Sequence, residues 1–242
     1  ADTEAGSEET GVRQDPLDRL ADKEPPDHMM RVELAPAKKN LKLGLAWYRD
    51  GKDKPPTTYE PEEMGEKVMI CNHPQDTGST DLEVRLLGRE KTPVDSGGFD
   101  YHLRTRDVAA EEGLELEPNN TLAEADRLEL AQQRVGYIAA PGDSDVYGFA
   151  VRDDSKESAD AGGLTAADPK RVTIHLKGNE LDLAVDVRDD EGGQIAAVNK
   201  AGVGGDEEVA LDLPPGLYFV RVSAESGFAC DPYRISVETE SE

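Results

Sequence analysis

The chain has 242 residues, with 27 Lys and Arg against 52 Asp and Glu, so its net charge is −25. Nucleic acid and anionic membrane surfaces attract basic proteins, so this charge argues against both as partners and favours divalent cations and basic surfaces. No apolar run approaches the ~20 residues that a membrane-spanning helix needs, which predicts a chain without a transmembrane segment.

Residues 1–27 are polar, acidic and proline-rich at their end, which predicts a flexible acidic leader. After them, apolar and polar residues alternate in short segments, which is the pattern of half-buried strands. Residues 52–63 interrupt this pattern and are typical of a loop. In this first half we expect strands at residues 32–34, 41–47, 67–71, 82–86 and 101–103.

Residues 108–242 repeat this order of strands, at residues 172–176, 181–187, 194–199, 220–222 and 233–235. We match residues 194–199 to the segment that holds Cys71. The sequence therefore predicts an all-β fold of two tandem, jelly-roll-like antiparallel β-sandwiches, at residues 28–107 and 108–242. The alternative to a true repeat is chance similarity between the strands of the two halves. The first copy has only the leader where the second has residues 115–149. It therefore either lacks its first strands or uses the leader in their place.

Residues 115–149 carry two groups of oxygen-bearing side chains: Glu115, Glu117, Asn119 and Asn120, and then Asp143 and Asp145. Hard cations such as Ca²⁺ take about six to eight oxygen ligands, and gathered carboxylates repel one another unless a cation neutralises them. The two groups therefore predict a calcium site. The alternative is a solvated acidic loop, because the spacing is not that of an EF-hand.

Between these two groups, residues 122–133 predict a short helix, with a loop as the alternative. Thr121 stands at the N-cap position and Glu124 at the matching position of a capping box. Both side chains would then satisfy backbone amides of the first helical turn.

Several short motifs of this half stand in the order of a known family: Glu115-Leu-Glu-Pro-Asn-Asn120, Gly136-Tyr-Ile, Gly142-Asp-Ser-Asp-Val-Tyr-Gly-Phe149, Leu181-Asp-Leu-Ala-Val, Gly216-Leu-Tyr-Phe-Val-Arg-Val222 and Tyr233-Arg-Ile. Together they resemble the bacterial pre-peptidase C-terminal domain, the family that includes the collagen-binding domains of clostridial collagenases. The resemblance covers about residues 115–238, and residues 28–106 resemble a weaker, degenerate copy.

This resemblance implies a secreted, non-catalytic, jelly-roll-like β-sandwich in which the Glu-x-Glu-Pro-Asn segment and the paired aspartates bind Ca²⁺. Carried over by position, the implied ligands are Glu115, Glu117, Asn119, Asn120, Asp143 and Asp145. Asn120 stands where the family usually has Asp, which removes one negative charge from the set.

The two cysteines, Cys71 and Cys230, lie far apart in the sequence. Outside the cytosol they can form one disulfide, which would tie the two halves together. The alternative is that they are two small buried residues of separate cores.

No arrangement of residues that is typical of an enzyme stands out. Asp76-Thr-Gly-Ser79 matches the local signature of aspartic proteases, but that chemistry needs two aspartates, and a single copy predicts a turn. We therefore expect a non-catalytic, extracytoplasmic protein that is secreted, periplasmic or surface-anchored and binds or targets a protein or polysaccharide. Alternatives are a structural or assembly subunit of a surface complex or filament, and accessory domains of a secreted peptidase.

Overall fold

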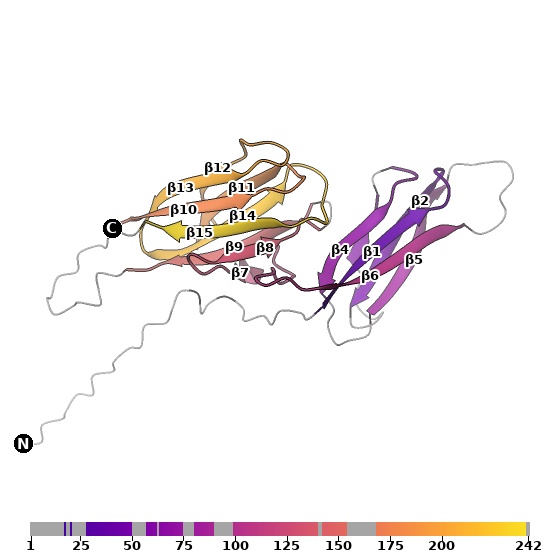
Figure 1. Cartoon of the computed structure of the whole chain (residues 1–242), viewed down its shortest axis with the longest axis horizontal. Coiled ribbons are helices and arrows are strands. Elements are labelled where there is room, and N and C mark those ends of the chain that lie inside the picture. The colour runs from indigo at the N-terminus through magenta and orange to yellow at the C-terminus, as the bar shows by residue number, and fades with distance from the viewer. Residues whose placement is uncertain are drawn as a thin grey trace, which may run out of the picture.

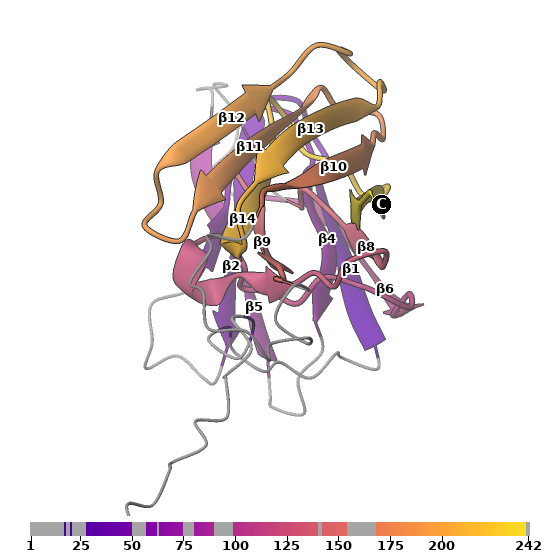
Figure 2. The ribbon, with the colours of Figure 1, turned by 90° about the vertical axis from the view of Figure 1, so that its left-hand side faces the viewer.

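The computed structural model describes residues 17, 20, 28–49, 57–61, 63–74, 80–89, 99–139, 142–153 and 168–240. Their regular secondary structure is almost entirely β-strand, in mainly antiparallel sheets that form β-sandwich-like domains, which confirms the predicted all-β fold class. The first half (residues 28–109) and the second half (residues 110–240) lie beside each other along the long axis (Figure 1). Figure 2 looks along that axis, with strands of the second half in front.

Some predictions cannot be compared with this structure. The predicted turn at residues 76–79 and most of the predicted leader lie outside the described residues. Among the residues that are described, no helix has the length and apolar character that crossing a membrane requires.

The first half consists of two three-stranded sheets packed face to face. The first has the order β4 (Val68–Pro74), β1 (His28–Pro36), β6 (Tyr101–Ala109), and the second has the order β3 (Thr57–Tyr59), β2 (Leu41–Arg49), β5 (Thr80–Arg89). Alternate residues of a strand point to one face, so Val32 and Leu34 of β1 meet Leu43 and Leu45 of β2 in a buried core.

The second half consists of a four-stranded and a five-stranded sheet. The four-stranded sheet has the order β13 (Glu207–Leu213), β10 (Lys170–Lys177), β15 (Tyr233–Thr239), β8 (Gln133–Gly136). The five-stranded sheet has the order β12 (Gln194–Val198), β11 (Leu183–Asp189), β14 (Gly216–Ala224), β9 (Ser144–Val151), β7 (Asp126–Arg127). Inward-facing residues of both sheets, among them Phe149, Val220 and Ile235, form the larger core.

The two halves share one pairing scheme, and it corrects one of the predicted correspondences. β1 pairs with β4 and β6 as β10 pairs with β13 and β15, and β2 pairs with β3 and β5 as β11 pairs with β12 and β14. The strand that holds Cys71, β4, therefore matches β13 and not residues 194–199. Those residues, in β12, match β3, which has only three residues and lies inside the predicted loop at 52–63.

The second half has β7, β8 and β9 in addition, and the described residues of the first half contain no counterpart of them. β8 and β9 cover the outer edges of β15 and β14, so the matching strands β6 and β5 are edge strands. Every residue of β6 except Val108 is exposed. The described leader residues, Leu17 and Leu20, do not fill this gap, because they pack against the second half.

The predicted helix at residues 122–133 is wrong. Only Leu122–Glu124 form one turn of 3-10 helix, and the Thr121 hydroxyl donates to the Glu124 carboxylate instead of accepting from a backbone amide. The chain then becomes extended, because Asp126 and Arg127 pair with β9 as β7. The pairing with β9 and the Asp126 carboxylate, which accepts from the Leu116 amide, outweigh a weak local helix preference.

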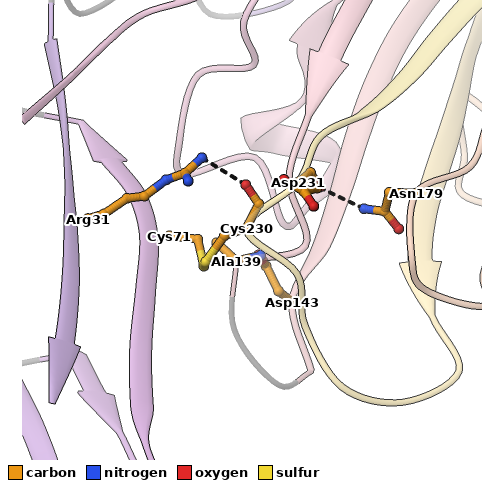
Figure 3. The surroundings of a disulfide bond; sticks show 7 residues. All are labelled: Arg31, Cys71, Ala139, Asp143, Asn179, Cys230 and Asp231. Atoms are coloured by element: carbon orange, nitrogen blue, oxygen red, sulfur yellow. Dashed lines mark hydrogen bonds between the residues drawn. A yellow bond between two sulfur atoms is a disulfide. The ribbon is translucent and has the colours of Figure 1, made fainter. Parts of the chain in front are cut away.

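A disulfide, a hydrogen bond and an apolar cluster join the two halves, and Figure 3 shows the disulfide and the hydrogen bond. Cys71 of β4 and Cys230 form a disulfide, with their Cα atoms 5.0 Å apart. Arg31 of β1 donates through Nη2 to the Cys230 carbonyl oxygen at 2.8 Å. Met29 of β1 packs in a buried cluster with Tyr137 and other residues of the second half. These contacts join β1 and β4 of the first half to the second half.

Candidate metal centre

A buried acidic cluster lies at the start of β9, where the segment 115–120 reaches the second sandwich. Side chains alternate along a strand, so Asp145 shares the inward face of β9 with Tyr147 and Phe149, and it is fully buried. The Val146 amide donates to the Asn119 carbonyl oxygen at 2.8 Å. This hydrogen bond fastens the 115–120 segment to β9 and places its side chains beside Asp145.

Three carboxylates of different exposure meet in this cluster. Glu115, Glu117 and Asp145 each offer an oxygen atom, and these three atoms lie within 4.8 Å of one another. Burial, followed by the negative charge of Glu117, raises the pKa of Glu115 well above its usual range. Burial, followed by the charge of Glu115, does the same to the pKa of Asp145. The folded chain thus holds carboxyl groups where their ionised forms are disfavoured unless a cation joins them.

Two buried tyrosines connect these carboxylates. The Tyr147 hydroxyl donates to Glu115 Oε2 at 3.0 Å, and the Tyr233 hydroxyl donates to Asp145 Oδ2. The two hydroxyl oxygens are themselves 2.7 Å apart. The three contacts are Glu115 with Tyr147, Tyr147 with Tyr233, and Tyr233 with Asp145. The two tyrosines supply only two hydroxyl protons, so all three contacts are hydrogen bonds only when one of the carboxyl groups is protonated. This count agrees with the raised pKa values of Glu115 and Asp145.

Two oxygen atoms of the cluster are buried and, within the described residues, accept no hydrogen bond: Asn119 Oδ1 and Asp145 Oδ1. Asn119 donates through Nδ2 to Glu115 Oε2 at 3.3 Å, and this contact fixes the orientation of its amide. A buried acceptor that lacks a donor is costly and rare in native proteins. A cation that binds these oxygens would satisfy both, so the residues present fit a metal ion.

The remaining predicted ligands are placed differently. Both oxygens of the Asp143 carboxylate accept from backbone amides, of Ala139 at 2.8 Å and Ser144 at 2.9 Å. Asn120 is exposed, and its Oδ1 accepts from the Ser144 amide at 3.2 Å. The structure therefore gathers Glu115, Glu117, Asn119 and Asp145, whereas Asp143 and Asn120 hold the turn that leads into β9. The charge of Asp143 still raises the pKa of Glu115 and Asp145.

The sequence motifs did not identify the two tyrosines as part of the cluster. Tyr147 lies two residues after Asp145 on the same strand, so strand alternation is a signal that places both on one face. Tyr233 lies 88 residues from Asp145 in the sequence, and no local pattern joins them. It reaches the cluster because β15 pairs with β8.

Gly136 makes room for the tyrosine pair, so we expect Gly136→Ala to destabilise the second half. An added Cβ would collide with the Tyr233 ring and hydroxyl and with the Tyr147 hydroxyl. The expected loss is roughly 1–3 kcal/mol in urea unfolding, as for other overpacked cores. Gly216→Ala is the control, because there the Cβ meets only atoms at 3.5 Å or more. Equal stability of the two variants would show that the tyrosines are free to move.

No protein-family model and no curated protein matches the chain. Among solved structures, the pre-peptidase C-terminal domain of Bacillus anthracis collagenase matches 51% of this chain and 100% of its own, at 20% identity and a TM-score of 0.35. The Aeromonas hydrophila PliG, a periplasmic inhibitor of g-type lysozyme, matches 48% of this chain and 97% of its own, at 11% identity and a TM-score of 0.28. Scores this low establish neither a family nor a function for this chain.

Proposed function

We propose that the chain is a non-catalytic, exported binding or targeting protein whose second sandwich is stabilised by Ca²⁺. The observation that carries the calcium part is the pair of buried oxygens on Asn119 and Asp145, beside three carboxylates. A bound cation would neutralise the carboxylates and satisfy both oxygens. The hydrogen bonds from backbone amides and tyrosine hydroxyls hold these carboxylates in place, which supports a role as ligands and not as proton-transfer groups.

The donor set supports a hard cation. Glu115, Glu117, Asn119 and Asp145 would hold it, and all of them offer oxygen, which suits Ca²⁺ or Mg²⁺ better than zinc or copper. Ca²⁺ tolerates irregular oxygen cages, whereas Mg²⁺ requires near-octahedral geometry and keeps several waters. A buried site made of side chains at irregular spacing therefore favours Ca²⁺.

Isothermal titration calorimetry on the full chain tests this proposal. We expect Ca²⁺ to bind the parent protein with one site, and Mg²⁺ to bind more weakly. Asp145→Asn should abolish the binding, whereas Asp168→Asn, at an exposed position of the same half, should leave it unchanged. If Ca²⁺ produces no heat and does not shift the melting temperature of the parent protein, the calcium part is wrong.

The raised pKa values of Glu115 and Asp145 predict that Ca²⁺ binding releases protons. Calcium needs both groups ionised, so its affinity should rise with pH across the range above the ordinary carboxyl pKa of about 4. Calorimetry in buffers of different ionisation enthalpy measures the protons released. A heat of binding that is the same in every buffer near pH 5 would contradict the prediction.

A cleft between the two halves supports a binding role. Its volume is about 610 Å³, and its walls include Tyr59, Lys67 and Met69 of the first half and Gly227 and Phe228 of the second. Volumes of this size accommodate a small ligand or a short stretch of a polymer. The rings of Tyr59 and Phe228 and the exposed carboxylates of Glu60 and Glu66, which also line the cleft, suit a ligand that is partly apolar and partly cationic.

Co-sedimentation with insoluble gelatin, cellulose and chitin tests the binding role. We expect the parent protein to be retained by at least one of these polymers, and Phe228→Ala to be retained less. Ile195→Ala removes an apolar side chain from β12, outside the cleft, and serves as the control. Equal retention of both variants would show that the binding surface lies outside the cleft. If no matrix retains the parent protein, targeting to these polymers is wrong.

The disulfide supports an extracytoplasmic location, because disulfides persist in oxidising compartments and are rare in the cytosol. It agrees with the location that the sequence predicts.

One observation favours a second candidate function, that of an assembly subunit. β5 and β6 of the first half are edge strands where the second half has β9 and β8, and Leu86, Tyr101 and Leu103 are exposed there. Exposed apolar edge strands are typical sites of strand addition between chains. Size-exclusion chromatography at high concentration distinguishes the two functions, because a strict monomer contradicts assembly through these edges. The role as an accessory part of a secreted peptidase stays a prediction from the sequence resemblance.

A further inference from the structure

The outer face of the five-stranded sheet carries an apolar strip. All eight residues of β9 are buried, so both of its faces are covered. The outward residues Val146 and Ala150 of β9 lie beside Leu217 and Phe219 of β14, and Ala125 completes the strip. Outward faces of antiparallel sandwiches are usually polar, and apolar patches on them mark interaction surfaces. We call these five residues the outer apolar strip.

The leader covers this strip with two leucines. Leu17 is only 2% exposed, although it lies in a polar, acidic stretch of sequence, and Leu20 packs against the same cluster. The Leu20 amide donates to the Leu17 carbonyl oxygen at 3.0 Å, which makes a tight turn. The contact is thus a short turn with two leucines three positions apart, and neither leucine belongs to a sheet.

The strip has a space that fits Leu20. Gly148 lies between Val146 and Ala150 on the outward face and is paired with Phe219 of β14. A Cβ at Gly148 would lie 2.6 Å from Leu20 Cδ1 and 3.2 Å from Leu20 Cδ2. The absence of a side chain at position 148 therefore creates the room that Leu20 fills, and the fit is specific to this position.

We propose that the outer apolar strip is a docking surface for a short Leu-x-x-Leu turn, and that the leader occupies it in cis. A segment of the same chemistry binds in trans when the leader withdraws. Withdrawal of these two leucines breaks no strand pairing, because neither Leu17 nor Leu20, the described residues of the leader, belongs to a strand. The inference builds on the proposed role in binding, but it is independent of the calcium cluster, which lies on the inward face of β9.

A labelled peptide of residues 13–24, added to the full chain, tests the proposal. The parent protein should bind it weakly, because the cis leader competes for the strip. Leu17→Ser combined with Leu20→Ser should bind the same peptide about tenfold more tightly or better, because the competing segment no longer occupies the surface. Fluorescence anisotropy measures both affinities, with circular dichroism as the check on folding.

A third variant locates the site. Gly148→Ala in the double-serine background should abolish peptide binding, whereas Gly216→Ala, which adds a methyl group to the partner strand β14 at ordinary distance, should retain it. Peptide binding that is equally tight for the parent and the double variant, or absent for both, would overturn the proposal. Repeating the titration with a chelator separates this result from any failure of the calcium proposal.

A second measurement does not depend on the leucine variants. In the otherwise unchanged chain, Gly148→Ala should push Leu20 out of its space, so the Leu20 amide should exchange with solvent faster than in Gly216→Ala. Equal exchange rates in the two variants would overturn the docking of the leader on the strip.

Discussion

Removal of calcium with a chelator is expected to lower the melting temperature of the chain by roughly 5–10 °C. A ligand at 100 times its Kd stabilises the folded state by about 2.7 kcal/mol. For a chain of this size each kcal/mol corresponds to roughly 2–4 °C. The loss should be confined to the second half, because Glu115, Glu117, Asn119 and Asp145 all belong to it. Differential scanning fluorimetry with and without chelator measures the effect.

Asp145→Asn should change the melting temperature in opposite directions with and without calcium. With calcium present, the variant should melt below the parent protein, since it has lost a ligand. With chelator at neutral pH, it should melt at or above the parent, because it removes a buried charge whose ionised form the fold disfavours. Asp168→Asn should follow the parent in both conditions. A variant that melts well below the parent even in chelator would show that Asp145 stabilises the fold without a cation.

The same groups predict that stability depends on pH without calcium and that this dependence disappears with calcium. Glu115 and Asp145 have raised pKa values in the fold, so the metal-free folded state binds more protons than the unfolded chain. Their contribution to stability is fully present below the ordinary carboxyl pKa of about 4 and is lost as the pH rises through the raised values. In saturating calcium the ionised groups are neutralised and the decline should disappear. Melting curves at several pH values, in chelator and in calcium, test the difference.

Loss of the Cys71–Cys230 disulfide is expected to have the second large effect. The bridge joins residues that are 159 positions apart, and the chain-entropy relation gives roughly 5 kcal/mol for a loop of that length. Without it, the two halves should unfold in separate transitions, because the contacts that still join them among the described residues, such as the Arg31 hydrogen bond and the cluster around Met29, are few and local. Scanning calorimetry of the parent protein with and without reductant, and of Cys71→Ser with Cys230→Ser, measures this change.

The double serine variant is also the control for the reductant. Reductant should change the melting of the parent protein and leave that of the variant unchanged, because the chain has no other cysteine. A single transition at an unchanged temperature after full reduction would show that noncovalent contacts alone couple the halves.

The long strands were predictable from the sequence, and the short ones were not. The alternation of Leu41, Leu43 and Leu45 marks β2 because every second side chain enters the core. β3 has three residues and β7 has two, which is too few to show a period. The capping signal at Thr121 pointed to a helix because local propensity cannot include the pairing of Asp126 with β9.

The candidate metal centre was predictable where its residues are neighbours in the chain. Glu115, Glu117 and Asn119 stand together in the sequence, and the structure keeps them together. Asn120 points elsewhere, because only alternate side chains of an extended segment face one side. The docking of Leu17 had no sequence signal, since two leucines in a polar stretch form no periodic pattern.

The position of the disulfide determines which part of the chain would bear a mechanical load. When tension pulls on the two ends of the chain, a covalent bond between Cys71 and Cys230 bears the force and bypasses the 159 positions between them. At roughly 3.5 Å per residue, about 550 Å of contour length stays hidden from the pull. Strands β5 to β14, together with the three carboxylates of the acidic cluster, therefore remain out of the force path, whereas residues 1–70 and 231–242 lie in it.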